Sequence, residues 1–217
     1  MSDPLQLRIT EIFHSLQGEA ATVGRPTVFV RLTGCPLRCQ YCDTAYAFTG
    51  GELLDLDAIL AKVESFQCSY VTVTGGEPLA QRECMPLLTM LCDRGFKVSL
   101  ETSGALPIES VDERVSVVMD LKTPGSQELS RNLDANIRHL KLKDQVKFVI
   151  CDRRDYEWSR SQLLLHRLDE RAGEVLFSPS HEELAPAELA RWILDDRLPV
   201  RMQMQLHKLI WGNAPGH

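Results

Sequence analysis

The chain has 217 residues, of which 44% are hydrophobic and 25% charged, and its formal net charge is −6. This composition is typical of a folded globular protein, and it argues against a general nucleic-acid-binding surface, which requires clustered Lys and Arg in excess. No segment approaches the roughly 20 consecutive apolar residues of a membrane span, and the first residues lack the apolar stretch of a secretory signal. We therefore expect a cytoplasmic protein, with no membrane association, whose partner is a small molecule.

The predicted elements alternate between strands and helices along the chain. Segments rich in Val, Ile, Phe and Thr predict strands at 8–13, 27–33, 70–74, 97–101, 115–121, 145–151, 174–178 and 200–206. Apolar periodicity and capping residues predict helices at 55–67, 82–94, 154–171 and 186–197, with a less regular helical pattern at 126–140. This alternation predicts βαβ units and a parallel sheet, and the strands are too few for a full eightfold barrel. The sequence therefore predicts one α/β domain over 1–217, a shortened, open (β/α) barrel or partial TIM barrel with its core roughly at 27–206.

The cysteines are unevenly distributed, because three of the seven lie within eight residues. Cys35, Cys39 and Cys42 directly follow a predicted strand, so they occupy a loop at its carboxyl end, where ligands bind in parallel sheets. Three thiolates can hold three irons of a 4Fe-4S cubane while the fourth iron stays open. Gly34 and Pro36 argue against a helix that simply buries three small side chains. The spacing therefore predicts a cluster whose open iron binds a further molecule.

Zinc is the alternative metal for this loop, since closely spaced cysteines also build structural zinc sites. Such a site needs a fourth ligand, and Cys68, Cys84 or His14 could supply it after folding. The cysteines outside the loop lie in or beside apolar patterns, where free Cys behaves as a small hydrophobe. Cys68, Cys84, Cys92 and Cys151 are therefore expected in the core.

Two polar turns follow the next two predicted strands. TGGEP (74–78) ends the first of these strands and ETSG (101–104) ends the second. Adjacent glycines let a backbone approach a ligand closely, and Glu77 can accept hydrogen bonds from an ammonium group. Either segment could instead be an ordinary turn, and in ETSG Thr102 could cap the segment that follows. Together they place candidate ligand-binding residues beside the cysteine loop.

The CxxxCxxC spacing, with Tyr41 before the last cysteine, together with GGEP and ETSG resembles the signature of the radical S-adenosylmethionine (SAM) superfamily. More narrowly, the chain resembles the 7-carboxy-7-deazaguanine synthase family over nearly its full length. The segments that carry this resemblance are EIFHSLQGE (11–19), VRLTGCPLRCQYCDT (30–44), DLKTPGS (120–126) and MQLHKLIWG (204–212). The resemblance implies a barrel of the radical SAM type in which the N-terminal strand and the C-terminal tail complete the substrate site.

The same resemblance implies a carbon-nitrogen lyase with one 4Fe-4S cluster, SAM and Mg2+ as cofactors. Such an enzyme converts 6-carboxy-5,6,7,8-tetrahydropterin to 7-carboxy-7-deazaguanine with loss of ammonia, in the biosynthesis of queuosine or another 7-deazapurine. It also implies an electron donor such as flavodoxin or ferredoxin, and a homodimer. Two other functions are compatible with the motifs: an activase that places a glycyl radical on a partner protein, and a non-enzymatic zinc or iron-sulfur module.

The resemblance further implies roles for individual residues. The residues implied to bind SAM are Tyr41, Gly75, Gly76, Glu77, Thr102, Ser103, Lys122 and Ser126. The residues implied to bind the substrate are Gln17, Glu19, Arg31, Thr74, Gln205 and His207. Cys35, Cys39 and Cys42 are the implied cluster ligands, and Thr44 is implied to contribute an oxygen to Mg2+.

The residue types suit these roles, although several have a simpler interpretation. A guanidinium pairs bidentately with a carboxylate, but Arg31 could also form a surface ion pair. Thr44 could be a helix cap. In the last predicted strand, Gln203, Gln205 and His207 share one face, which could line a cavity or face solvent.

Overall fold

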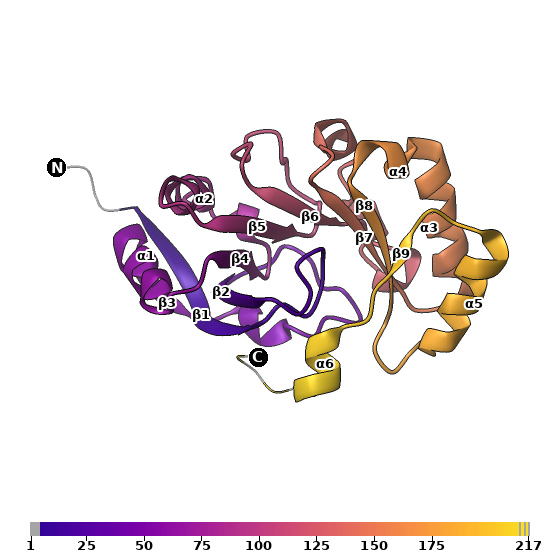
Figure 1. Cartoon of the computed structure of the whole chain (residues 1–217), viewed down its shortest axis with the longest axis horizontal. Helices are drawn as coiled ribbons and strands as arrows, with labels where there is room; N and C mark the ends of the chain where they lie inside the picture. Colours follow the sequence, from indigo (N-terminus) through magenta and orange to yellow (C-terminus); the bar gives the residue numbers. More distant parts are fainter. Residues whose placement is uncertain (1–4, 213, 215, 217) are drawn as a thin grey trace.

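One nine-stranded sheet organises the protein, which this computed structural model describes at residues 5–212, 214 and 216 (Figure 1). The prediction that the chain does not start with a secretory signal rests partly on residues 1–4, which lie outside the described residues. The strand order is β3-β1-β2-β4-β5-β6-β7-β8-β9. The strands are β1 (Gln6–Leu16), β2 (Pro26–Leu32), β3 (Glu52–Asp55), β4 (Tyr70–Gly75), β5 (Lys97–Thr102), β6 (Ser116–Asp120), β7 (Gln145–Ile150), β8 (Glu174–Pro179) and β9 (Arg201–Met202). β1 pairs antiparallel with β2 and β3, whereas the succession from β2 to β9 is parallel.

All but the last of the helices lie on one side of this sheet (Figure 1). They are α1 (Leu56–Ser65), α2 (Cys84–Asp93), α3 (Arg153–His166), α4 (Leu168–Arg171), α5 (Pro186–Asp196) and α6 (Leu206–Trp211). In Figure 1 the sheet curves, with α1 to α5 around its outside and α6 at its open side. In the described part of the chain, β3 and β9 are the two free edges of the sheet, so the barrel is open. The predicted fold class, an α/β protein with a mostly parallel and unclosed sheet, is confirmed.

Alternation along the strands separates an apolar outer face from a polar inner face. On β4, Val71 and Val73 belong to the core under the helices, whereas Thr72 and Thr74 point to the opposite face. The same alternation recurs on the neighbouring strands. The polar side chains that it places inside the curved sheet are Arg31, Thr72, Thr74, Ser99, Glu101, Asp120 and Lys147. The inner face is therefore suited to bind a polar ligand.

The predicted helix at 126–140 is wrong. The chain forms three short 3-10 turns there, Pro124–Ser126, Leu129–Arg131 and Asp134–His139. Asn132 exchanges hydrogen bonds with the backbone of Lys122, at 2.8 and 2.9 Å. Because Asn side chains that bind backbone groups compete with helical hydrogen bonds, they favour turns here.

The predicted strand at 200–206 is also wrong beyond its start. β9 ends at Met202, and the Leu206 N–H donates to the Gly18 carbonyl at 3.0 Å, where α6 begins. The proposed shared strand face of Gln203, Gln205 and His207 therefore does not exist. The sequence also failed to predict β3, and the predicted helix at 154–171 divides into α3 and α4 at Arg167, whose φ of 49° is left-handed.

The core contains two of the four cysteines expected there. Cys84 and Cys92 are buried in it, and Cys68 packs against it while half-buried. Cys151 lies outside this core at the end of β7 and is only half-buried, so its predicted core position is wrong. No helix among the described residues combines the length and apolar character that crossing a membrane requires.

Candidate active site

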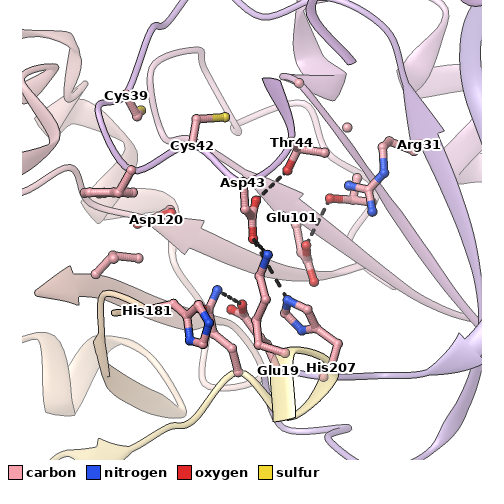
Figure 2. Close-up of a pocket in the computed structure, with 18 of the residues that line it drawn as sticks. Glu19, Arg31, Cys39, Cys42, Asp43, Thr44, Glu101, Asp120, His181 and His207 are labelled. Carbon is pink, nitrogen blue, oxygen red and sulfur yellow. Dashed lines mark hydrogen bonds and ion pairs between the residues drawn. The ribbon is translucent and has the colours of Figure 1, made fainter. Parts of the chain in front are cut away.

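A cavity of about 560 Å³ opens at the carboxyl ends of the parallel strands (Figure 2). This is where ligands bind in sheets of this kind. The predicted site residues that line it are Gln17, Glu19, Arg31, Cys35, Cys39, Tyr41, Cys42, Thr44, Thr74, Gly75, Gly76, Thr102, Ser103, Lys122, Gln205 and His207. Two predicted residues, Glu77 and Ser126, are not in its lining.

The cysteine loop forms one end of the cavity, with all three thiols free and partly exposed. Three backbone hydrogen bonds hold the loop in place: Gly34 N–H to the Ala47 carbonyl, Glu77 N–H to the Gly34 carbonyl, and Gln40 N–H to the Ser126 carbonyl, at 2.8, 2.8 and 3.1 Å. Three soft ligands on one fixed loop, open to a cavity, fit an iron-sulfur cluster.

Burial affects the chemistry of these thiols. It raises the pKa of Cys39 to about 11 and also raises the pKa of Cys35 and Cys42. A cysteine binds a metal as the thiolate, so metal binding displaces the thiol protons. The loop therefore presents thiols that a metal has to deprotonate.

The two glycines of GGEP are required because this turn packs closely against the end of β2 and the cysteine loop. A Cβ on Gly75 would lie 2.4 Å from the Leu32 carbonyl oxygen, and one on Gly76 would lie 2.1 Å from the Gly34 carbonyl oxygen. No side chain fits where two backbones approach so closely. The glycines thus bring the end of β4 against the cysteine loop, in addition to lining the cavity.

Glu77 lies behind the cavity wall, where it organises the ETSG turn. Its fully buried carboxylate accepts from the Thr102 hydroxyl at 3.0 Å and from the Ser103 N–H at 2.7 Å. It also accepts from the Leu79 N–H at 3.0 Å. Thr102 and Ser103 are the residues of this group that line the cavity, and Glu77 fixes them.

The DLKTPGS segment contributes Lys122 from the end of β6. Its ammonium lies 2.8 Å from an Asp120 carboxylate oxygen and 5.9 Å from the centre of the Tyr41 ring. Burial alone would lower the pKa of Lys122, but Asp120 together with Cys39 and Cys35 raises it, so the side chain is a cation. Ser126 is buried, and its carbonyl holds the cysteine loop through Gln40.

Two of the predicted substrate residues, Gln17 and Thr74, bind the same carboxyl group. Gln17 Nε2 donates to Thr72 Oγ1 at 3.1 Å and to Glu101 at 3.3 Å. Thr74 donates to the same Glu101 carboxylate at 2.9 Å. Burial raises the pKa of Glu101. Gln17, directly after β1, thus meets residues of β4 and β5 around one largely buried carboxyl group.

Glu19 connects the C-terminal segment to the sheet. Its carboxylate accepts from Lys147 at 2.7 Å, from Gln203 at 3.3 Å and from Gln205 at 3.1 Å. Burial alone would lower the pKa of Lys147, but Glu19 and then Asp120 raise it. Gln205 therefore reaches the cavity through its bond to Glu19, and not as one residue of an alternating strand.

Thr44 and Asp43 present oxygens beside α6. The Thr44 hydroxyl donates to Asp43 at 2.6 Å and makes no capping bond to the 3-10 turn that follows. Asp43 lies 3.9 Å from His207 and 3.8 Å from Lys208 (Figure 2). Burial would raise the pKa of Asp43, but the nearby His207 and the hydrogen bond from Thr44 lower it, so its carboxylate is ionised. Hydroxyl and carboxylate oxygens at a cavity wall fit a hard cation such as Mg2+.

The charged cavity residues that were not predicted as site residues include Asp43, Glu101, Asp120 and Lys147. Asp43, Glu101 and Asp120 lie inside or next to the motifs, and Lys147 is the one charged residue within the apolar strand QVKFVI. The available signal was the strand alternation, which places Glu101, Asp120 and Lys147 on the face opposite the core.

A parallel sheet that carries CxxxCxxC at one strand end and GGEP at the next defines a radical SAM protein. Residues 29–144 match the Radical SAM superfamily profile. The crystal structure of QueE from Escherichia coli superimposes with a TM-score of 0.76 and 24% identity, covering 93% of this chain and 95% of that one. This likeness confirms the fold.

Curated relatives narrow the class further. The chain is 44% identical over 216 residues to the 7-carboxy-7-deazaguanine synthase of Chlorobaculum tepidum, covering 98% of this chain and 97% of the relative. It is 43% identical to that of Koribacter versatilis, covering 94% and 97%. The chain belongs to the 7-carboxy-7-deazaguanine synthase family. Membership implies an iron-sulfur cluster of the 4Fe-4S type and SAM, which decides between iron and zinc at the cysteine loop.

Proposed function

We propose that this protein converts 6-carboxy-5,6,7,8-tetrahydropterin to 7-carboxy-7-deazaguanine with loss of ammonia, in the biosynthesis of queuosine or another 7-deazapurine. The observation that carries the proposal is the content of one cavity. The cysteine loop lies at one end, and Arg31 lies with the Gln17–Glu101 network away from it (Figure 2). A carboxylated, N–H-rich heterocycle suits this combination of a guanidinium with amide and carboxylate groups.

The chain itself binds and orients in this proposal. When bound, the cluster and SAM supply the one-electron cleavage that starts the radical chemistry. Arg31 pairs with the substrate carboxylate, and Glu19, Gln17 and Glu101 face the N–H groups of the pterin edge. Catalysis by these residues is positioning, because the reaction needs no protein nucleophile.

We also propose Mg2+ as a cofactor, held by the Thr44 hydroxyl and the substrate carboxylate. Asp43 supports the proposal, since its ionised carboxylate lies beside Thr44 and adds negative charge near the cation. Among the described residues no three His, Cys, Asp or Glu side chains converge on one ion position. A hard cation that keeps several waters and uses few protein oxygens is consistent with this.

The test of the proposal uses anaerobically reconstituted, chemically reduced protein with SAM, Mg2+ and the carboxytetrahydropterin. We expect about four irons and four sulfides per chain, formation of 5'-deoxyadenosine, and the 7-carboxy-7-deazaguanine product by mass spectrometry. A triple Cys35→Ala, Cys39→Ala, Cys42→Ala variant is the control and should lose both metal and turnover. Absence of 5'-deoxyadenosine with the wild-type protein and this substrate would refute the assignment.

Three further expectations are proposals of the same kind. The chain forms a single domain, because one sheet and one apolar core run through it. A flavodoxin or ferredoxin supplies the electron, and two copies form a homodimer. Size-exclusion chromatography with light scattering measures the oligomer, and replacing the chemical reductant by each candidate donor measures the electron transfer.

A further inference from the structure

Arg31 is held by a residue that does not line the cavity. Glu11 Oε1 accepts from Arg31 Nε at 2.6 Å and from the Tyr46 hydroxyl at 2.8 Å. The side chains of Arg31 and Glu11 are 14% and 20% exposed, so the ion pair is largely shielded from water. One carboxylate oxygen thus anchors two neighbours of the cavity wall.

Glu11 leaves the two terminal nitrogens of the Arg31 guanidinium available to a ligand. Arg has five N–H donors, and Glu11 occupies the one on Nε. The guanidinium carbon lies 5.7 Å from the centre of the Phe13 ring and 5.9 Å from that of Tyr46, and Phe13 stacks on Phe29. Rings on the guanidinium and an acceptor on Nε restrict its rotation. Figure 2 shows the guanidinium directed toward the cavity residues.

A β-bulge in β1 creates this pairing. Ile9 opposes Leu32 and Glu11 opposes Arg31, so β1 contains one extra residue between the two pairs. A bulge reverses which face the following side chains occupy. Before it, Ile9 lies in the core under the helices, whereas after it Glu11 and Phe13 share the inner face with Arg31.

We propose that Glu11 is a positioning residue for carboxylate recognition: by binding Nε of Arg31, it aims the two terminal nitrogens at the carboxylate of the ligand. The inference rests on the proposed function, in that the ligand carboxylate is that of the carboxytetrahydropterin. Glu11 acts through the geometry of Arg31, because its own negative charge adds nothing to the attraction of an anion. An acceptor without charge at the same place therefore preserves part of the effect.

The experiment compares two ligands in binding to reconstituted protein with SAM: the carboxytetrahydropterin and a tetrahydropterin without the 6-carboxyl group. For the Glu11→Ala variant we expect the Kd of the carboxylated ligand to rise about tenfold, as for the loss of one charge-assisted interaction. The Kd of the ligand without the carboxyl group should change less than about twofold. Glu11→Gln, which keeps an acceptor, should weaken binding of the carboxylated ligand several-fold less than Glu11→Ala does. Glu52→Ala on the exposed strand β3 is the matched control.

A double-mutant cycle with Arg31→Ala completes the test. Once Arg31 is removed, Glu11→Ala should have no further effect on the Kd of the carboxylated ligand, because the two residues act as one unit. Equal weakening of both ligands, or full additivity with Arg31→Ala, would overturn the inference. So would a wild-type protein that binds both ligands equally. A wild-type protein that prefers the carboxylated ligand without converting it would refute the proposed function and still leave the binding comparison to decide the role of Glu11.

Discussion

Replacing Lys147 by Met is expected to destabilise the protein more than any comparable change at its surface. The Lys147 ammonium lies 2.7 Å from Glu19 and 3.8 Å from Asp120, and the three side chains are only 12% to 15% exposed. Lys147→Met would keep the volume of the side chain but leave Glu19 as a buried carboxylate without its cation. Loss of one partner is the costly event in a buried ion pair, because desolvation of the remaining charge is no longer compensated.

The expected cost follows from this burial. Breaking a buried ion pair by removing one partner costs about 3–5 kcal/mol of the free energy of unfolding. For a chain of this size, each kcal/mol corresponds to roughly 2–4 °C in Tm, so Lys147→Met should lower Tm by roughly 6–20 °C. The neighbouring carboxylates raise the pKa of Lys147, and a raised Lys pKa contributes stability below its unfolded value. The full contribution is therefore present at pH 7.

Thermal unfolding of the metal-free protein, followed by circular dichroism under reducing conditions, measures this cost. Lys141→Met is the control, because Lys141 is exposed and precedes the same strand; its free energy of unfolding should stay within about 0.5 kcal/mol of wild type. Glu19→Gln in the Lys147→Met background should restore part of the lost stability by removing the unpaired charge. Equal Tm values for Lys147→Met and Lys141→Met would refute the reasoning.

Two further predictions concern the glycine contact and the buried carboxyl group. Gly76→Ala would place a Cβ 2.1 Å from the Gly34 carbonyl oxygen, so it should displace the cysteine loop at a cost of about 1–3 kcal/mol and lower the iron bound on reconstitution. Gly24→Asn, at a left-handed position in open space, is the control, and full iron content in Gly76→Ala would contradict the prediction. Burial raises the pKa of Glu101, so this group contributes stability below its unfolded pKa that is lost as pH rises through the folded pKa. Glu101→Gln should therefore gain stability relative to wild type as pH increases in urea unfolding series, and a constant difference between the two proteins would argue against a raised pKa.

Local sequence determined the parts of the site that lie within a few residues of one another. CxxxCxxC, GGEP and ETSG each occupy one loop directly after one strand, so their position at the carboxyl edge follows from the strand that precedes them. The parallel sheet could be predicted because the alternation of strands and helices is also a local pattern. Most strand bounds were predicted within one or two residues because β-branched runs and turn residues are local signals.

The tertiary structure determined which of the site residues contact one another. Glu19 meets Lys147 across 128 positions of sequence, and Gln17 meets Glu101 across 84, so no local pattern records either contact. The bulge that turns Glu11 toward Arg31 depends on the pairing of β1 with β2, and a shift of one residue would direct a different side chain inward.

The two wrong element predictions have the same physical cause. In the first, Asn132 and the backbone of Lys122 form hydrogen bonds with each other that replace helical ones. In the second, the chain after Met202 leaves the strand because Gln203 binds Glu19 and the Leu206 N–H binds the Gly18 carbonyl. Short-range propensity differs between helix and strand by fractions of a kcal/mol per residue, whereas a buried polar group left without a partner costs about 1–3 kcal/mol. Local sequence therefore determined the positions of the cysteine loop and its neighbouring turns. The pairing of buried polar groups in the assembled barrel determined which charged side chains face that loop.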